Sequence, residues 1–226
     1  ISDLHCPWEH PDAFAFLKAL KKKIKPDFVL NLGDEADAHA LSMHDSDPDL
    51  MSAGDELIAA KKRLHKLEKI FPKMTLLHSN HSSLIYRRAL KHGMPRAYLK
   101  NYNSFLEVGP GWEWVDDITI PLSDGTTAFA THGMSADGLK LAMQYGQHTI
   151  QAHFHSKMNI SYFSNPSSLI WSMQVGCLTK QSSLAFQYAR NFKMRFVIGT
   201  GAVINGQPKL YIMRLNKDNR WDGKIV

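Results

Sequence analysis

Two histidines stand two residues apart in the stretch "TIQAHFHSKMN", at the end of an apolar run that predicts a β-strand. Side chains at alternate positions of a strand point to the same side, so His153 and His155 are expected on one face. The imidazole nitrogen is a common ligand of transition metals. Two readings are open: the pair lies at a sheet edge in water, or a cation holds both rings.

Four further polar clusters follow predicted strands. They are "SDLH" with Asp3 and His5, "LGDEAD" with Asp34 and Asp37, "HSNHSS" with Asn80 and His81, and "ATHGM" with His132. Each alone is a weak signal, because a single histidine at a strand end is more often hydrogen-bonded structure than a ligand. Together they indicate one site, since polar residues past the carboxyl ends of strands gather in one crevice of an α/β sheet.

The residue types of these clusters indicate which metals would bind. Two Asp, one Asn and four His supply oxygen and nitrogen donors without a thiolate, which suits Mn, Fe or Zn in a catalytic rather than a structural site. Seven ligands are too many for one ion and fit two ions that share a carboxylate. Such a pair clamps the attacking and leaving oxygens of a phosphoryl displacement. We therefore expect two divalent metal ions, Mn first, with Fe, Zn or Ni as alternatives.

These clusters must be positioned by alternating strands and helices. Apolar spacing predicts helices over residues 11–24, 50–71, 84–92, 96–106 and 136–145. Short strands are predicted over 28–32, 74–78, 112–115, 118–121, 127–131, 161–163 and 169–175, and two closing strands meet at an Asn-Gly turn. The pattern predicts one α/β domain over residues 1–226, with mixed strand directions.

Composition narrows the class of protein. The chain has 226 residues, is 44% hydrophobic and shows no apolar run that could span a bilayer, so we expect a globular protein with no membrane partner. Two cysteines do not make a disulfide framework, which favours a cytoplasmic location. The net charge of +6 leans toward an anionic partner such as nucleic acid, although lysines on helices more often form a solvated face. "ISDLHCP" resembles the tail of a strand, so we expect a processed, trimmed or partly disordered N-terminus, with export as the alternative.

The ordered clusters resemble the calcineurin-like metallophosphoesterase superfamily. Its pattern is DxH, GDxxD, GNH followed by Asp or Glu, a lone His, and GHxH, which here runs from Asp3 to His155. The resemblance implies a metallophosphoesterase-type two-sheet β-sandwich flanked by helices. It also implies a ligand set: Asp3, His5 and His155 for one metal ion, Asn80, His132 and His153 for the other, and Asp34 as the bridge.

The resemblance assigns catalytic roles as well. His81 would be the general acid that protonates the leaving oxygen, and Asp37 would be its carboxylate partner, while a metal-bridging hydroxide attacks phosphorus. The sequence departs from the pattern at Ser79 and Ala152, which replace glycines, and at Ser82, which replaces an acid. No ligand position is lost.

The residues around the motifs indicate a branch of the superfamily. "AHA" after GDxxD and "SS" after Asn-His argue against the protein Ser/Thr phosphatases. The chain is similar to the phosphodiesterase and nuclease side, including small bacteriophage-encoded members, which would work in the host cytoplasm. We therefore expect hydrolysis of phosphodiester bonds in nucleic acid or nucleotides. The alternatives are a phosphomonoesterase acting on a small molecule or protein, and a weakly catalytic binding module.

Three further residues are candidates for substrate binding. Arg87 and Arg88 follow His81 on a predicted helix and could grip a phosphate with bidentate geometry. His39 lies in the polar loop after Asp37, where substrate residues often occur. Each can equally be read as a solvated surface residue.

Overall fold

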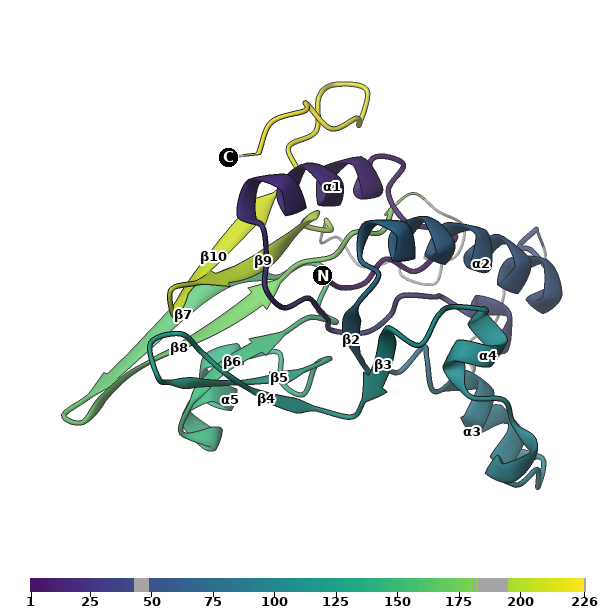
Figure 1. Ribbon diagram of the computed structural model, residues 1–226, viewed down its shortest axis with the longest axis horizontal. Coiled ribbons are helices and arrows are strands. Elements are labelled where there is room, and N and C mark those ends of the chain that lie inside the picture. The colour runs from purple at the N-terminus through teal and green to yellow at the C-terminus, as the bar shows by residue number, and fades with distance from the viewer. Residues whose placement is uncertain (43–48, 181, 183–194, 226) are drawn as a thin grey trace.

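The first sheet has three parallel strands and carries part of the predicted crevice. The computed structural model describes residues 1–42, 49–180, 182 and 195–225. Strands β1 (Leu30–Asn31), β2 (Met74–Leu77) and β3 (Trp112–Val115) pair in that order, all parallel (Figure 1). Their carboxyl ends therefore lie at one edge of the sheet.

The second sheet has five strands in the order β4-β5-β6-β8-β7. Their bounds are Ile118–Pro121 for β4, Thr127–Thr131 for β5, His148–Gln151 for β6, Met158–Asn165 for β7 and Ser168–Val175 for β8. Strands β5, β6 and β8 are parallel, and the edge strands β4 and β7 are antiparallel to their neighbours. The mixed strand directions were predicted.

A hairpin of β9 (Gly199–Ile204) and β10 (Gln207–Ile212) lies beside the second sheet (Figure 1). Its two turn residues, Asn205 and Gly206, have φ angles of 51° and 75°. A two-residue turn with both φ angles positive matches the twist of the strands, and Asn-Gly is the preferred pair for it. The predicted hairpin is confirmed.

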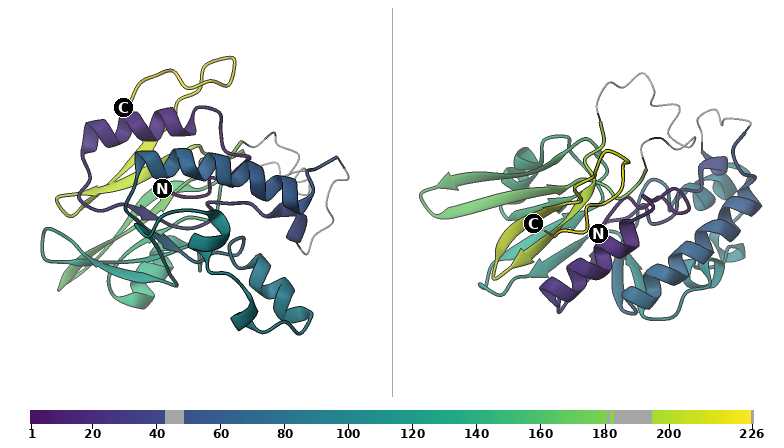
Figure 2. Two further views of the ribbon diagram at one scale, coloured as in Figure 1. Left: turned by 45° about the vertical axis from the view of Figure 1, so that its right-hand side comes forward. Right: turned by 90° about the horizontal axis from the view of Figure 1, so that it is seen from above.

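The described residues form five α-helices. They are α1 (Ala13–Ile24), α2 (Ala53–Ile70), α3 (Leu84–Lys91), α4 (Tyr102–Leu106) and α5 (Gly138–Tyr145), with short 3₁₀ helices η1 (His39–Leu41) and η2 (Arg96–Tyr98). Helices α1 and α2 pack on the three-stranded sheet through a core that includes Phe16, Leu64 and Leu76. Helix α5 packs on the five-stranded sheet, and Figure 2 shows the helices on opposite sides of the strands.

A second core lies between the two sheets. Leu32 and Leu77 at the ends of β1 and β2 meet Ala130, Ile150 and Met173 from the five-stranded sheet, and all are nearly inaccessible to water. Because side chains of both sheets fill this layer, the arrangement is a sandwich. The predicted α/β two-sheet sandwich with flanking helices is confirmed.

One predicted helix is broken. The segment 96–106 forms η2, an extended residue at Leu99 and then α4. Asn101 caps α4, because its side-chain oxygen accepts a hydrogen bond from Ser104 N at 2.9 Å. Asparagine is a favoured N-cap residue, so the new helix starts there instead of continuing the previous one.

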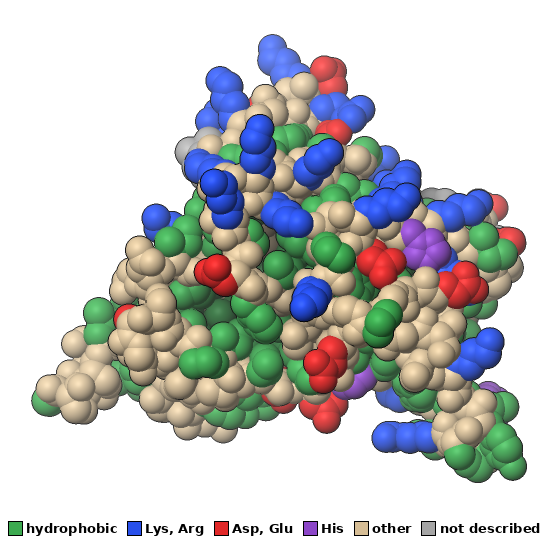
Figure 3. All heavy atoms as spheres, viewed as in Figure 1, with side chains coloured by type: hydrophobic (Ala, Val, Ile, Leu, Met, Phe, Trp, Pro, Cys, Tyr) green, Lys and Arg blue, Asp and Glu red, His purple; other side chains and the backbone are tan. Residues whose placement is uncertain are grey.

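Lysines crowd the outer face of α1 and α2. Lys18, Lys22 and Lys66 are exposed there, and Figure 3 shows Lys and Arg side chains gathered over this face. Two of its lysines contact backbone carbonyls, since Lys21 Nζ donates to Ile70 O and Lys23 Nζ to Ile225 O. Among the helices of the described residues, none combines the length and apolar character needed to cross a bilayer.

Candidate metal centre

The candidate ligands lie just past the carboxyl ends of four strands. Asp34 follows β1, Asn80 and His81 follow β2, His132 follows β5, and His153 and His155 follow β6. Asp3 and His5 reach the same place from the N-terminal loop, because Asp3 N donates to Gly33 O at 3.1 Å and His5 N to Asp34 O at 2.8 Å. The turns named in the sequence therefore converge on one crevice.

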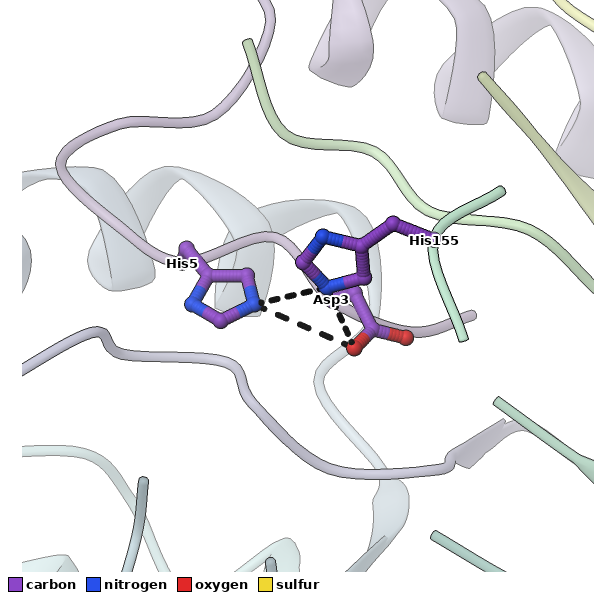
Figure 4. A group of neighbouring side chains, drawn as sticks. All are labelled: Asp3, His5 and His155. Atoms are coloured by element: carbon purple, nitrogen blue, oxygen red, sulfur yellow. Dashed lines mark hydrogen bonds and ion pairs between the residues drawn. The ribbon is translucent and has the colours of Figure 1, made fainter. Parts of the chain in front are cut away.

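Asp3, His5 and His155 form the first group of possible ligands (Figure 4). Each offers one donor atom, and these atoms lie within 4.8 Å of one another. His155 Nε2 is 3.1 Å from Asp3 Oδ1 and 3.2 Å from His5 Nε2. Two imidazole nitrogens and a carboxylate oxygen thus surround one point, as ligands of a cation do.

Asp34, His132 and His153 form the second group, with Asn80 beside it. His132 Nε2 is 3.2 Å from Asp34 Oδ2 and 3.2 Å from His153 Nδ1. Asn80 Oδ1 lies 2.8 Å from the same His132 nitrogen. This group again mixes oxygen and nitrogen donors.

Asp34 lies between the two groups. Its Oδ2 atom is 3.6 Å from His5 Nε2 in the first group and 3.2 Å from His132 Nε2 in the second. Its other oxygen accepts a hydrogen bond from His81 N at 3.2 Å, which fixes the orientation of the carboxylate. One carboxylate is thus placed to serve both groups.

The hydrogen bonds of Nδ1, the ring nitrogen that points away from the candidate metal position, show whether these histidines are suited to bind a metal. His5 Nδ1 is 2.7 Å from Asp37 Oδ1, and His132 Nδ1 is 2.7 Å from Leu32 O. Because an ionised carboxylate and a carbonyl can only accept, each Nδ1 carries the proton, and a lone pair is left on Nε2 when the ring is neutral. Metal-binding histidines have this outer hydrogen bond. The donor set and its outer partners fit divalent cations.

His81 lies against both Asp34 and Asp37. Its Nδ1 is 2.5 Å from Asp37 O and 3.2 Å from Asp37 Oδ1, and its ring packs edge-on against His5 with centroids 4.6 Å apart. Asp37 contacts His81, and it also contacts His5. This second contact was not predicted, because the sequence does not show which rings share one carboxylate.

Burial and charge shift the pKa values of these groups in opposite directions. Burial opposes ionisation of Asp37, but hydrogen bonds from His5 and His81 outweigh it and lower the pKa to about 2. Burial likewise opposes protonation of His5 and His132, yet nearby carboxylates raise the pKa to about 10 for His5 and about 9 for His132. For His81 the pKa is raised as well, since Asp34 and Asp37 outweigh burial. The buried carboxylates therefore favour positive charge in the crevice.

The backbone of the crevice is unusual. Asp3, His5, Asp34 and His153 have φ angles of 47°, 49°, 53° and 67°. Positive φ costs a residue with a side chain about 1–2 kcal/mol, and such conformations concentrate at functional sites. The positive φ angles of these four residues thus cost free energy, and contacts with the surrounding residues must offset that cost.

The expectation that His153 and His155 share one face of a strand is wrong. Strand β6 ends at Gln151, and the positive φ of His153 turns the chain immediately after it. The alternation of side chains that applies inside a strand does not extend past its end. As a result His153 joins the group of His132, and His155 joins the group of Asp3.

The three candidates for substrate binding have different surroundings. Arg87 is exposed and donates to Asn80 O at 2.9 Å, beside the centre. Arg88 donates to Leu41 O at 2.8 Å and to Ser42 O, so it holds the end of η1. His39 is 4% exposed, with its Nδ1 3.9 Å from Asp37 Oδ2. Their contact with substrate stays a prediction.

Sequence reasoning missed Glu56 on α2. Its carboxylate accepts hydrogen bonds from the backbone of His39 and Ala40 and from Trp8 Nε1, at 3.1–3.2 Å. It thereby ties the loop after Asp37 to the helix. The sequence does contain a signal for this role. Glu56 lies four residues before Ala60, on the buried face of α2, and a buried acid requires a hydrogen-bond partner.

One family model matches most of the chain. A family model described as calcineurin-like phosphoesterase matches residues 1–197. Among solved structures, the crystal structure of Vps29 from Chaetomium thermophilum aligns with 97% of this chain and 91% of its own chain, at 13% identity and a TM-score of 0.43. No curated protein matches the sequence.

Proposed function

The chain belongs to the calcineurin-like phosphoesterase family of metal-dependent phosphoester hydrolases, and we propose that it cleaves phosphodiester bonds in nucleic acid or nucleotides. The observation that carries the proposal is the pair of ligand groups joined by Asp34, with His81 beside them. A binding module would have no chemical need for this set.

Each group would hold one divalent cation, and Mn is the first candidate. Asp3, His5 and His155 would bind one ion, Asn80, His132 and His153 the other, and Asp34 both. When bound, two such cations supply positive charge that makes water more acidic and offsets charge on the phosphoryl oxygens. The outer hydrogen bonds of His5 and His132 hold a proton on each Nδ1, so that Nε2 is the nitrogen that binds a cation once its own proton is lost.

His81 would supply the proton that the leaving oxygen needs. Its Nδ1 is engaged by Asp37, so the opposite nitrogen is the one that can act on a substrate. Asp34 and Asp37 raise the pKa of His81, which favours the protonated ring that a general acid requires. An alkoxide is a poor leaving group, so a general acid contributes most where the leaving group is an alcohol.

Two exposed carboxylates favour a diester over a monoester. Asp116 and Asp117 border the small cavity, of about 380 Å³, that contains Asn80, His132 and His153. A monoester carries up to two negative charges near neutral pH and a diester only one, so the monoester experiences more repulsion from these side chains. This agrees with the "AHA" and "SS" sequences, which argue against the protein phosphatase branch.

The test compares two chromogenic substrates in the presence of Mn²⁺. We expect bis-p-nitrophenyl phosphate to be hydrolysed faster than p-nitrophenyl phosphate, and both activities to disappear in Asp34→Ala. Faster turnover of the monoester would replace the diesterase proposal by the phosphomonoesterase alternative. Activity in Asp34→Ala equal to that of the unmodified protein would contradict the site itself.

A further inference from the structure

A larger cavity adjoins the candidate metal centre. Its volume is about 1040 Å³, and its border includes His78, Tyr86, Arg87, Arg96, Tyr102 and Trp114. His78 and Asp116 border this cavity and also the small cavity that contains Asn80, His132 and His153. The larger cavity is therefore adjacent to the metal ligands, within reach of the rest of a molecule whose phosphate lies at them.

Aromatic rings in mutual contact form one wall of this cavity. Tyr102 lies at their centre, stacked on Trp114 with centroids 5.2 Å apart and planes 19° apart, and it also contacts His78 and Tyr86 at 5.2 and 5.3 Å. Tyr102 itself is buried, whereas the other three rings are half-buried. These three leave aromatic surface accessible from the cavity.

Hydrogen bonds fix this wall to the catalytic turns. Trp114 Nε1 donates to Glu35 Oε1 at 3.1 Å, and Glu35 directly follows the candidate bridging residue Asp34. Tyr102 Oη donates to Ser82 O at 3.1 Å, and Ser82 directly follows His81. The rings are thus held in a defined position relative to the centre, so that little ordering is required when a ligand stacks on them.

The charges around the cavity indicate what kind of ligand would enter. Arg87 and Arg96 are opposed by Glu113 and Asp116, and all four are exposed. Because the signs balance, the cavity offers little net attraction to a second phosphate group. A neutral aromatic ring would gain stacking from the rings and from a guanidinium, and a carboxylate could accept hydrogen bonds from ring amino groups.

We propose that this cavity binds the base of the nucleotide whose phosphate is cleaved at the centre. The inference rests on the proposed function, which places the phosphate at the metal ligands, and it adds the class of substrate: a phosphodiester with a nucleobase on one side. A nucleobase stacks on aromatic side chains whatever its sequence, with a contribution that corresponds to about tenfold in affinity per base.

Binding to the metal-free protein tests the base site without catalysis. Adenosine 5′-monophosphate is titrated beside ribose 5-phosphate, which lacks only the base, and tryptophan fluorescence is recorded with excitation outside the adenine band. We expect the nucleotide to bind about tenfold tighter and to quench the fluorescence, and the quenching to disappear in Trp114→Phe. Equal affinity for the two ligands would overturn the proposal.

Two variants locate the binding site. Tyr86→Ala and Arg96→Ala each change one border residue, and both should reduce the preference for the nucleotide over ribose 5-phosphate, by up to about tenfold for Tyr86→Ala. Tyr86→Phe keeps the ring and should keep the preference. Tyr98→Ala is the matched control, because Tyr98 is 79% exposed and does not border the cavity. An unchanged preference in correctly folded Tyr86→Ala and Arg96→Ala would contradict the assignment.

Kinetics separate this proposal from the proposed function. With Mn²⁺, thymidine 5′-(p-nitrophenyl phosphate) is compared with methyl p-nitrophenyl phosphate, which has the same leaving group. We expect kcat/KM to be about tenfold higher for the nucleoside ester, mostly through KM. Hydrolysis of both esters at equal efficiency would overturn the base site alone. If neither ester is hydrolysed, the proposed function fails, and the binding titration still decides whether a base binds.

A parallel titration with hexa-adenylate identifies the source of the base. Tighter binding than that of adenosine 5′-monophosphate would support the proposal with a nucleic acid strand as ligand, and equal binding would support it with a free nucleotide. Failure of both to bind better than ribose 5-phosphate would again overturn it.

Discussion

The orientation of each imidazole ring decides how it can act. His5 and His81 both direct Nδ1 toward Asp37, so one buried carboxylate orients a candidate ligand and the candidate general acid together. His132 is oriented instead by a carbonyl, Leu32 O. The rings are therefore set before any cation binds, which limits the reorganisation that binding requires.

The roles of His81 and Asp34 predict different effects of their removal. His81→Ala should retain two bound Mn²⁺ ions and lose most activity toward a dinucleoside phosphate, about 10²-fold or more, because an alkoxide leaving group needs the proton donor that is missing. Asp34→Ala should lose metal as well, since one carboxylate serves both groups. Metal content measured by mass spectrometry on dialysed protein checks both. Two ions per chain in Asp34→Ala would contradict the bridging role.

Protons and metal ions should compete for the centre. The raised pKa values of His5, about 10, and His132, about 9, mean that both rings are protonated at pH 7 in the metal-free protein. A ligand must lose its proton, so Mn²⁺ binding at pH 7 should release about two protons, and affinity should rise with pH toward 9–10. Titration calorimetry in two buffers of different ionisation enthalpy measures the release. Binding with no proton release would show that the rings start neutral.

The same shifts set the sign of the pH effect on the metal-free fold. Folded pKa values of His5 and His132 above the usual 6.5 contribute stability that is complete below pH 6.5 and is lost as pH rises through 9 to 10. As pH rises through 9 to 10, the metal-free fold therefore loses this contribution from the two rings, whereas the affinity for metal increases.

The positions of the site residues were predictable where they follow from the pattern of neighbouring residues in the sequence. The ends of the strands, and hence the convergence of Asp34, Asn80 and His132, follow from apolar runs and their polar termini. Two contacts were not predictable, because they depend on which residues packing brings together. They are the contact of Asp37 with His5 and the contact of the Glu56 carboxylate with η1.

At the level of elements, the turn after β1 depends on a glycine. Gly33 has a φ of 105°, and a Cβ placed on it would lie 2.7 Å from Ser79 Cβ and 2.8 Å from His132 Nδ1. Either distance is too short for real atoms, so a side chain here would displace the turn of Asn80 or the ring of His132. The close approach of three elements at this point leaves room for no side chain.

Gly33→Ala should therefore weaken the metal centre as well as the fold. Gly93→Ala is the matched control, because Gly93 also has a positive φ, 73°, but nothing lies within 4 Å of its added Cβ. Gly93→Ala should cost about 1 kcal/mol in the free energy of unfolding, from backbone conformation alone. Gly33→Ala should cost more, about 2–4 kcal/mol, and reduce Mn²⁺ affinity. Urea unfolding and Mn²⁺ titration of both variants measure these changes. Equal losses of stability and of Mn²⁺ affinity in the two variants would show that the contacts around Gly33 have no effect.

Elements with a local signal were predicted better than those fixed by packing. The closing hairpin was found because Asn205-Gly206 suits its turn, and α2 because its apolar spacing runs over several turns. The break between η2 and α4 was missed, since an isolated Asn101 is compatible with a continuous helix and with a cap. Strand β1 is shorter than predicted, as only Leu30–Asn31 pairs regularly with β2.

At the level of the whole molecule, the centre joins parts that are distant in sequence. Asp34 and Asn80 follow strands of the three-stranded sheet, whereas His132 and His153 follow strands of the five-stranded sheet. Asp3 and His155, which contact each other, are 152 positions apart. Cations bound here would cross-link both sheets and the N-terminal loop, and the unfolded chain cannot offer this arrangement.

Metal binding should therefore stabilise the entire fold. At a free Mn²⁺ concentration about a hundredfold above Kd, one site that exists only in the folded state adds about 2.7 kcal/mol, which for a chain of this size raises Tm by about 5–10 °C. Thermal unfolding with Mn²⁺ and with EDTA measures the shift. His92→Ala, which removes an exposed histidine outside both ligand groups, should keep it, and Asp34→Ala should lose it. A shift of the same size in Asp34→Ala would contradict the bridging role of this carboxylate.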